Sequence, residues 1–182
     1  MAQGTRSALV LRGLLILITG GLIIPLASGF ATGIPLDLTL ALIGSTLLIE
    51  YGAVIAGTAL TLPLSFSFLV VLSVGWGAII AQFPLFDAFA KEEGRVFAFI
   101  NRVRSRGDGC REGAWYIRWG VLGLAPSTIV LGFYLTPAIA WVLGWRRDLA
   151  LVMMLTGYTL ATAITAGVTA GVISLAFPNW PI

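Results

Sequence analysis

Long apolar runs separated by short polar segments dominate the pattern along the chain. Three of them, residues 9–30, 64–86 and 149–177, carry at most one charged residue each. A helix of about 20 apolar residues is long enough to cross a bilayer. We therefore predict three full transmembrane helices from these runs.

Two further apolar blocks, residues 36–62 and residues 119–144, are interrupted near their middle. The first contains Glu50-Tyr51-Gly52, and the second contains a stretch from Ser127-Thr128 to Gly132. An arm of about 13 residues on each side of an interruption reaches roughly 20 Å as a helix, enough to pass mid-membrane and return. Backbone that is not helical at such depth must be buried in protein or face water. We predict re-entrant hairpins here, with two ordinary kinked spans as the alternative.

The positions of the basic residues favour re-entrant hairpins over kinked spans. The polar stretch of residues 87–118 is rich in cations, namely Lys91, Arg95, Arg102, Arg104, Arg106, Arg111 and Arg118. The positive-inside rule places this stretch in the cytoplasm, together with the N-terminal end at Arg6 and the turn at Arg146-Arg147. An even number of crossings must then separate these landmarks. This parity is met when both interrupted blocks return to the side that they left.

The chain then divides into two similar halves, each a broken hairpin followed by a full span. The first hairpin enters from outside and the second from the cytoplasm, which is an inverted-topology repeat. Residues 72–76 (LSVGW) resemble residues 154–158 (MLTGY), which supports the repeat. The predicted fold class is all-α integral membrane, an inverted repeat of re-entrant hairpin plus transmembrane helix, in a single membrane domain of residues 1–182.

Residues 87–118 are predicted to form a cytoplasmic amphipathic segment. Apolar and charged residues alternate in its first part at roughly helical spacing. Such a segment lies on the membrane surface with its arginines near anionic lipid head groups. The bilayer and its anionic lipids are therefore the expected partners.

Composition supports the membrane location and excludes several functions. Apolar types make up 58% of the chain and charged types 10%, and the mean hydropathy is +0.98. A water-soluble surface needs more charge than this. The net charge of +3 reports orientation in the membrane, because the cations flank apolar runs, and we expect no nucleic-acid partner.

The residue types also limit the chemistry. The chain has no histidine and one cysteine, which excludes His-ligated metal or haem and an intrachain disulfide. It shows neither a nucleophile–base pair nor a phosphate-binding loop. We therefore expect no catalytic residues, no metal, no cofactor and no enzymatic activity.

Glu50 is the most informative candidate for a functional site, because it lies far inside an apolar block. A carboxylate in hydrocarbon is costly, so it should face the bundle interior or a water-filled cavity. Burial favours the neutral carboxylic acid, and binding of a proton or a substrate at the tip of the first hairpin is one interpretation. A structural pair with an arginine, or a position at the membrane surface, is the alternative.

Ser127 and Thr128 follow Pro126 in the second hairpin. Their hydroxyls are candidates to line a substrate path, and equally to satisfy backbone groups that the proline frees. Arg118 is a candidate to bind an anionic substrate or to pair with Glu50, with a simple anchor at the membrane surface as the alternative.

Arg146 and Arg147 lie where lipid phosphates would be, so contact with anionic head groups is their expected role, again with anchoring as the alternative. A run of threonines shares one face of the last span, either lining a polar path or bonding to its own helix: Thr156, Thr159, Thr162, Thr165 and Thr169. Two small-xxx-small pairs, Gly29 with Gly33 and Gly167 with Gly171, suit close packing within the chain or in a homodimer.

Residues 48–173 resemble the small multidrug export family of prokaryotic membrane proteins. Ile49-Glu50 followed by Thr61-Leu62-Pro63 is similar to the family's first repeat, although Gly52 stands where the family has arginine. Pro126-Ser127-Thr128, with the Arg146-Arg147 pair, is similar to its second repeat. The layout also resembles DedA-type proteins, whose two opposed hairpins are associated with moving lipids across the bilayer.

The resemblance implies a membrane transporter for a small or amphiphilic solute, acting by proton-coupled export or by lipid translocation. We expect a multi-pass protein of the cell membrane with its N-terminus in the cytoplasm. A non-transporting subunit or assembly partner of a larger membrane complex is the alternative function, because the spans hold few polar groups.

Overall fold

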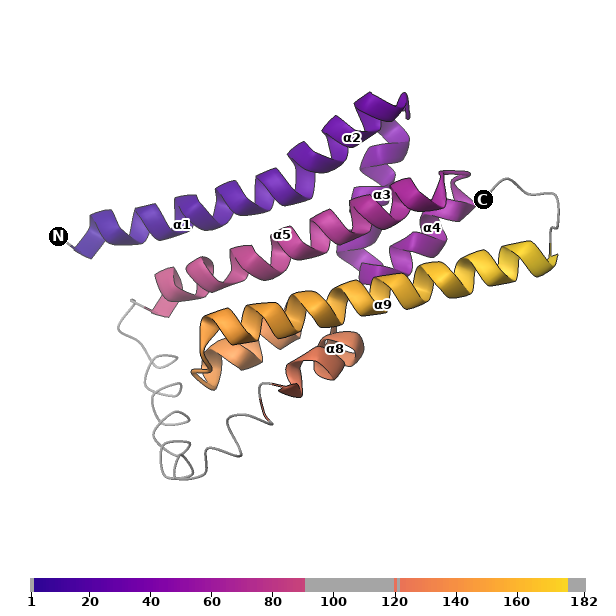
Figure 1. The fold of residues 1–182 in the computed structure, drawn as a ribbon. Helices are drawn as coiled ribbons and strands as arrows, with labels where there is room; N and C mark the ends of the chain where they lie inside the picture. Colours follow the sequence, from indigo (N-terminus) through magenta and orange to yellow (C-terminus); the bar gives the residue numbers. More distant parts are fainter. Residues whose placement is uncertain (1, 91–119, 121, 177–182) are drawn as a thin grey trace. The chain divides into compact units, whose positions relative to one another are not determined.

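Helices are the regular elements of the part of the chain that the structure describes. The computed structural model describes residues 2–90, 120 and 122–176, and no strand occurs among them. The elements, in chain order, are α1 (Ala2–Ile18), the π-helix η1 (Thr19–Ile23), α2 (Ile24–Thr32), α3 (Leu36–Ile49), the 3-10 helix η2 (Glu50–Gly52), α4 (Ala53–Ala59), α5 (Leu64–Ala90), α8 (Leu124–Val142) and α9 (Arg147–Ala176) (Figure 1). The all-α expectation is confirmed for these residues.

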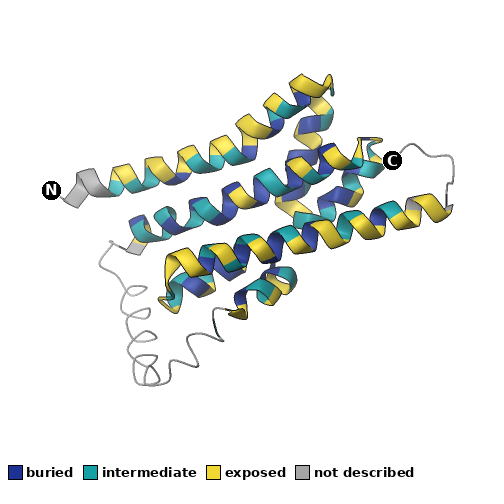
Figure 2. Cartoon of the chain, viewed as in Figure 1, coloured by how far each residue is buried: buried dark blue, intermediate teal, exposed yellow. Residues whose placement is uncertain are grey.

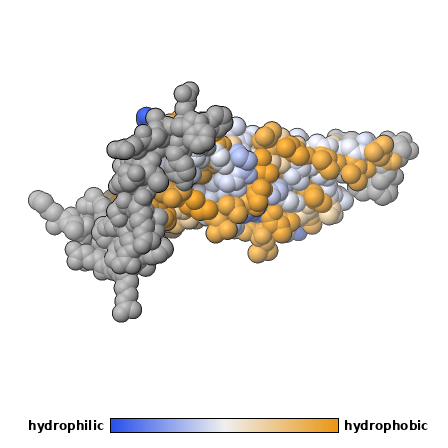
Figure 3. All heavy atoms as spheres, turned by 90° about the horizontal axis from the view of Figure 1, so that it is seen from below, coloured by the Kyte–Doolittle hydropathy of each residue, from blue (hydrophilic) through white to orange (hydrophobic). Residues whose placement is uncertain are grey.

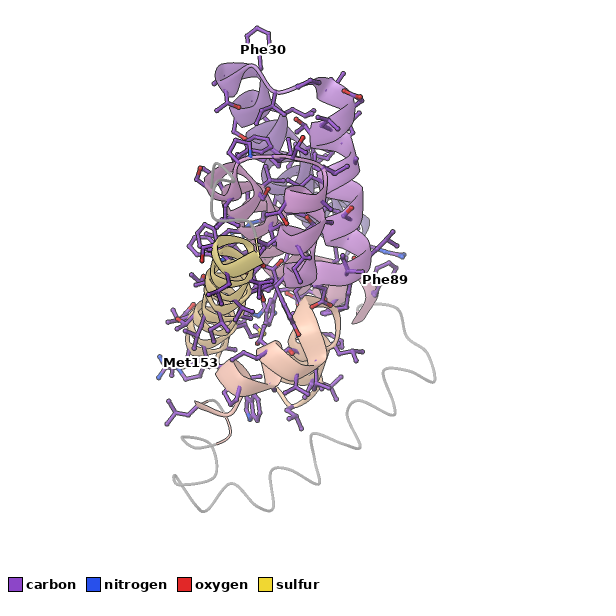
Figure 4. The ribbon with its side chains drawn as sticks, turned by 90° about the vertical axis from the view of Figure 1, so that its right-hand side faces the viewer. Phe30, Phe89 and Met153 are labelled. Atoms are coloured by element: carbon purple, nitrogen blue, oxygen red, sulfur yellow. The ribbon has the colours of Figure 1, made fainter. Side chains whose placement is uncertain are left out.

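Five helical segments in the described ranges are long and apolar enough to cross a membrane: Arg6–Thr32, Leu36–Ala59, Leu64–Phe89, Leu124–Val142 and Arg147–Val172. Large apolar side chains stay exposed along them, as the yellow residues of Figure 2 and the orange surface of Figure 3 show. Phe30 is 91% exposed and Phe89 is 61% exposed, and both project from the ribbon in Figure 4. Such a surface is costly in water, and lipid chains would cover it in a multi-pass membrane protein.

The helices of the three predicted full spans differ slightly from their predicted bounds. The first span, predicted for residues 9–30, runs through α1, η1 and α2 from Ala2 to Thr32. Helix α5 begins at Leu64 as expected and continues to Ala90, beyond the predicted end at residue 86. Helix α9 begins at Arg147, before the predicted start at residue 149, because the Arg146 carbonyl already accepts a helical bond from the Ala150 N–H at 2.9 Å. The amphipathic segment predicted for residues 87–118 lies outside the described residues from residue 91 onward.

The chain divides into two compact units. Unit 1 comprises residues 1–16 and 78–157, and unit 2 comprises residues 17–77 and 158–182. The boundaries fall within α1, α5 and α9, so each unit contains part of these three helices. Each unit also contains one of the interrupted blocks: unit 2 has α3, η2 and α4, and unit 1 has α8.

The predicted interruption at Glu50-Tyr51-Gly52 is confirmed. Helix α3 ends at Ile49, and Glu50 departs from helical geometry with φ 53° and ψ −128°. Helices α3 and α4 then lie against each other, because a Cβ on Gly57 of α4 would come within 3.3 Å of Leu42 Cδ1 on α3. Leu42 and Gly57 are almost equally far along the chain from Glu50, so the two helices pack antiparallel (Figure 1).

The interruption of the second block lies at Gly132. This buried glycine has φ 74° and ψ −172° and separates two helical parts of α8. We refer to residues 124–131 as the first arm of α8 and to residues 133–142 as its second arm. Ser127 and Thr128, which the sequence placed in the interruption, lie within the first arm. The break needs glycine because side chains disfavour this region of φ and ψ.

Local backbone features recur at a nearly constant spacing. Glu50 and Gly132, the two break residues, are 82 positions apart. The helices that follow the breaks end in the same Schellman bonds, from Thr61 N–H to Thr58 O and from Leu62 N–H to Gly57 O in α4, and from Gly144 N–H to Trp141 O and from Trp145 N–H to Ala140 O in α8. The left-handed residues of these caps, Thr61 (φ 60°) and Gly144 (φ 68°), are 83 positions apart.

Candidate functional site at the two helix breaks

Glu50 forms the break between α3 and η2. Its φ and ψ are those of the first central residue of a type II′ turn, a position at which glycine is favoured. A non-glycine residue there carries strain of about 1–3 kcal/mol. The Glu50 side chain is partly buried. The backbone conformation at this position therefore favours glycine, yet the residue is a glutamate with a carboxylate side chain.

Two buried hydroxyl side chains, Thr46 of α3 and Ser67 of α5, lie in unit 2 near helices α3 and α4. The Thr46 hydroxyl donates to Leu42 O at 2.8 Å, so it satisfies its own helix. Ser67 of α5 is fully buried beside Gly57 of α4, and among the described residues its hydroxyl oxygen lacks a hydrogen-bond partner. A Cβ on Gly57 would collide with Ser67, so the absence of a side chain on Gly57 lets α4 approach α5 closely.

Side chains of unit 1 donate hydrogen bonds to the backbone carbonyls at the Gly132 break. The Thr136 hydroxyl donates to Gly132 O at 2.9 Å, and the Gln82 amide Nε2 donates to Phe133 O at 2.8 Å. Both bonds place a donor on a carbonyl at the break, where backbone at membrane depth needs a partner. Gln82 was not singled out from the sequence, although it is the one amide side chain in residues 64–86.

The hydroxyls of Ser127 and Thr128 bond to their own helix. Both donate to Leu124 O, at 3.0 Å and 2.7 Å, and Thr128 is fully buried. This geometry matches the structural interpretation of the two residues, in which they satisfy backbone near Pro126. It leaves their oxygen atoms available only as acceptors.

A cluster around Asp87 was missed by sequence reasoning. The Asp87 carboxylate accepts a hydrogen bond from Trp141 Nε1 at 3.0 Å and another from Arg147 Nη2 at 2.6 Å. The Phe86 ring also lies against the Trp141 ring, with centroids 5.5 Å apart. No local sequence pattern marks this cluster, because Asp87 is 54 positions from Trp141 and 60 positions from Arg147.

The predicted arginine contacts have mixed outcomes. Arg147 pairs with Asp87 and is still about half exposed, so one side of its guanidinium is engaged within unit 1. Arg146 is exposed in the turn before α9. Arg118 lies outside the described residues, so its expected contact with Glu50 or with an anion stays a prediction.

The threonines of α9 mostly bond to their own helix. Thr162, Thr165 and Thr169 donate to the carbonyls four residues earlier, at distances from 2.7 to 2.9 Å. Thr159 differs, because its hydroxyl accepts a hydrogen bond from the Trp76 indole at 3.1 Å. These bonds match the structural interpretation for Thr162, Thr165 and Thr169, in which the hydroxyls bond to their own helix.

The two small-xxx-small glycine pairs differ in their surroundings. Gly29 packs closely on the Thr39 side chain, with its Cβ position 2.6 Å from Oγ1, whereas Gly33 is the left-handed cap of α2 with φ 70°. Gly167 and Gly171 have open space beside them. Elsewhere in unit 2, the ring of Tyr158 fills the space beside Gly75, and its hydroxyl donates to Val71 O at 3.2 Å.

Side-chain hydrogen bonds in unit 1 thus hold the break at Gly132 and join α5, α8 and α9 at Asp87. Within the described ranges, no group of three or more Cys, Asp or Glu side chains is arranged to hold a metal ion. Comparison of the chain with protein-family models, with curated proteins and with solved structures finds no match.

Proposed function

We propose that the chain is a membrane transporter that moves a small or amphiphilic solute, lipids included. The observation that supports this most strongly is the recurrence of a helix break, a Schellman cap and a following long helix at a spacing of 82 to 83 positions. Inverted repeats with broken helices are the common architecture of secondary transporters, whose binding sites lie where the helices are broken.

Three contacts show which ends of α1, α5 and α9 belong to each unit. In unit 1, Gly13 of α1 packs on Leu85 of α5, with its Cβ position 2.7 Å from Leu85 Cγ, and Asp87 of α5 pairs with Arg147 of α9. In unit 2, Gly20 packs on Gly77, with its Cβ position 2.7 Å from the Gly77 Cα. The basic landmarks Arg6 and Arg147 therefore belong to the unit that contains α8, and α3 and α4 belong to the other.

Glu50 is the proposed coupling group of this transporter. Its strained backbone position supports a role for the carboxylate, because glycine at the same place would relieve the strain. A proton or another cation bound by Glu50 would neutralise the charge at membrane depth. The helix ends at a break would present partial charges to the solute. This function needs binding groups and motion and no catalytic residues.

The similarity of the motifs around Glu50 and Arg146-Arg147 to the small multidrug export family, and of the layout to DedA-type proteins, agrees with this proposal. The anionic head groups of cytoplasmic lipids are the partners proposed for Arg146 and, through its exposed side, for Arg147. We place the N-terminus and residues 87–118 in the cytoplasm of a cell-membrane protein on the positive-inside rule.

Transport by purified protein in liposomes tests the proposal. We expect wild-type protein to move a labelled phospholipid between leaflets, or to accumulate a cationic dye under a pH gradient, and Glu50→Gln to abolish that activity. Asp37→Asn is the matched control, because Asp37 is an exposed acid in the first turn of α3. Loss of activity in both variants, or in neither, would refute the role of Glu50.

A non-transporting subunit of a larger membrane complex is the second candidate. It is favoured by the bonds of Ser127 and Thr128 to Leu124 O, because these hydroxyls then offer little to a solute. Mass measurement of the protein extracted from its native membrane in mild detergent separates the two functions. A stoichiometric partner, together with liposomes no more active than protein-free ones, would establish the subunit function.

A further inference from the structure

Gln82 of α5 lies at the break of α8 and uses only one end of its amide there. Its Nε2 donates to Phe133 O at 2.8 Å. A carbonyl oxygen can only accept, so the amide nitrogen faces Phe133 O and the Oε1 oxygen is directed elsewhere. Among the described residues, this Oε1 has no hydrogen-bond partner. The break therefore carries an amide whose acceptor end is unpaired.

The unpaired oxygen of Gln82 is accessible. Of the fully buried side-chain nitrogens and oxygens in the described ranges, Ser67 Oγ of unit 2 is the atom without a partner. Gln82 is only partly buried, and its Oε1, which also lacks a partner, is therefore not fully buried. Gln82 and Phe133 both belong to unit 1, so this geometry lies within one compact unit. Another molecule can reach the oxygen at the break.

Gln82 also lies farther along the apolar part of α5 than the charged cluster at its end. Asp87, which pairs with the half-exposed Arg147, follows Gln82 by five residues, or roughly 8 Å of helix. In the proposed membrane protein, Gln82 is that much deeper in the bilayer. An amide oxygen without a partner is costly where water is scarce. A bound group that donates a hydrogen bond to Oε1 would remove this cost.

The hydroxyls of α8 do not offer an equivalent group. Ser127 and Thr128 donate to Leu124 O, and Thr136 donates to Gly132 O. Thr128 and Thr136 are fully buried, so a solute does not reach their oxygens. Gln82 therefore presents a polar atom at the break that these threonines do not.

We propose that Gln82 is a solute-binding residue whose Oε1 accepts a hydrogen bond from an ammonium or hydroxyl group of the solute. A site that accepts a hydrogen bond discriminates against an analogue without the donor, because its polar atom is then left unpaired. This inference rests on the proposed function and narrows the solute to molecules that carry an N–H or O–H donor. Binding at Gln82 is measurable in protein that transports nothing.

Native mass spectrometry of the full chain with three lipids of matched acyl chains tests the proposal. Phosphatidylethanolamine carries an ammonium donor, diacylglycerol carries a hydroxyl donor, and phosphatidylcholine carries neither. We expect wild-type protein to retain one of the two donor lipids about three- to tenfold more than phosphatidylcholine, as for one net hydrogen bond. Gln82→Met, which is similar in size, should abolish that preference. The lipid whose preference is lost identifies the donor as ammonium or hydroxyl.

Thr136→Val is the matched control, because it also removes a donor from a carbonyl at the break but leaves Gln82 Oε1 in place. It should keep the wild-type preference. Equal retention of all three lipids by wild-type protein, a preference that survives in Gln82→Met, or the same loss in both variants would overturn the proposal. Translocation of the same lipids in liposomes is measured separately. Selective retention without translocation would refute the proposed function and leave the Gln82 site standing.

Discussion

Glu50 and Gly132 lie 82 positions apart in the chain, and each breaks a helix with a positive φ. At Gly132 the residue type suits the backbone, and at Glu50 it does not. The strain at Glu50 is a local cost that the fold tolerates. Backbone strain of this kind clusters at functional sites in proteins.

Replacing Glu50 by glycine should separate stability from function. We expect Glu50→Gly to raise the free energy of unfolding by about 1 kcal/mol through relief of strain, and the thermal midpoint by about 2–4 °C. The same variant should lose transport. Thr61→Gly is the control, because Thr61 has φ 60° and is exposed. It should gain similar stability and keep transport; retention of transport by Glu50→Gly would make Glu50 a structural residue.

Gly75 leaves space that the Tyr158 ring fills, so a larger side chain should disturb unit 2. We expect Gly75→Leu to lower the free energy of unfolding by about 1–3 kcal/mol, because a Cβ there overlaps the ring. Gly167→Ala should instead be neutral or stabilising by up to about 1 kcal/mol, since open space lies beside it and alanine is the better helix former. Thermal unfolding in detergent measures both; equal effects would contradict the packing.

Gln82 should stabilise the break at Gly132. We expect Gln82→Leu to cost about 1–3 kcal/mol, because Phe133 O loses its donor. Ser127→Ala should cost less than about 1 kcal/mol, since Leu124 O keeps its bond from Thr128. Chemical denaturation in mixed micelles compares the two variants. A larger loss in Ser127→Ala than in Gln82→Leu would contradict this account of the break.

The two arginines before and at the start of α9 should differ in lipid binding. Arg147 is engaged by Asp87, so we expect Arg146→Ala to weaken association with anionic lipid more, by about 1 kcal/mol or roughly fivefold. Native mass spectrometry with anionic and zwitterionic lipids measures the difference. Arg147→Ala should weaken lipid association less than Arg146→Ala, and a reversed order would contradict the assignment.

Thiol labelling tests the proposed topology. Cysteines introduced at Asp37 and Pro63 flank α3 and α4, and both positions are exposed. We expect an impermeant maleimide to label both from outside the cell, while the native Cys110 reacts only from the cytoplasm. Labelling of Asp37 and Pro63 positions from opposite sides would mean that the first block crosses the membrane as a kinked span.

The sequence alone determined the helical, membrane-type character of the chain and the approximate position of the first break. Apolar runs of about 20 residues leave few alternatives to helices, and Glu50-Tyr51-Gly52 interrupts one of them visibly. The second break was placed too broadly, because Ser127 and Thr128 satisfy their hydroxyls within a helix and so disturb it little.

Only the tertiary structure decided which polar groups meet. The Asp87 cluster and the bond from Gln82 to Phe133 O join residues that are 51 to 60 positions apart, and nothing in local pattern encodes such pairs. The same holds for Gly75 and Tyr158, because a glycine reveals its partner only when another helix packs against it. Hydropathy fixes which segments form apolar helices, whereas the choice of contacts between helices depends on side-chain shape and hydrogen bonding at long range.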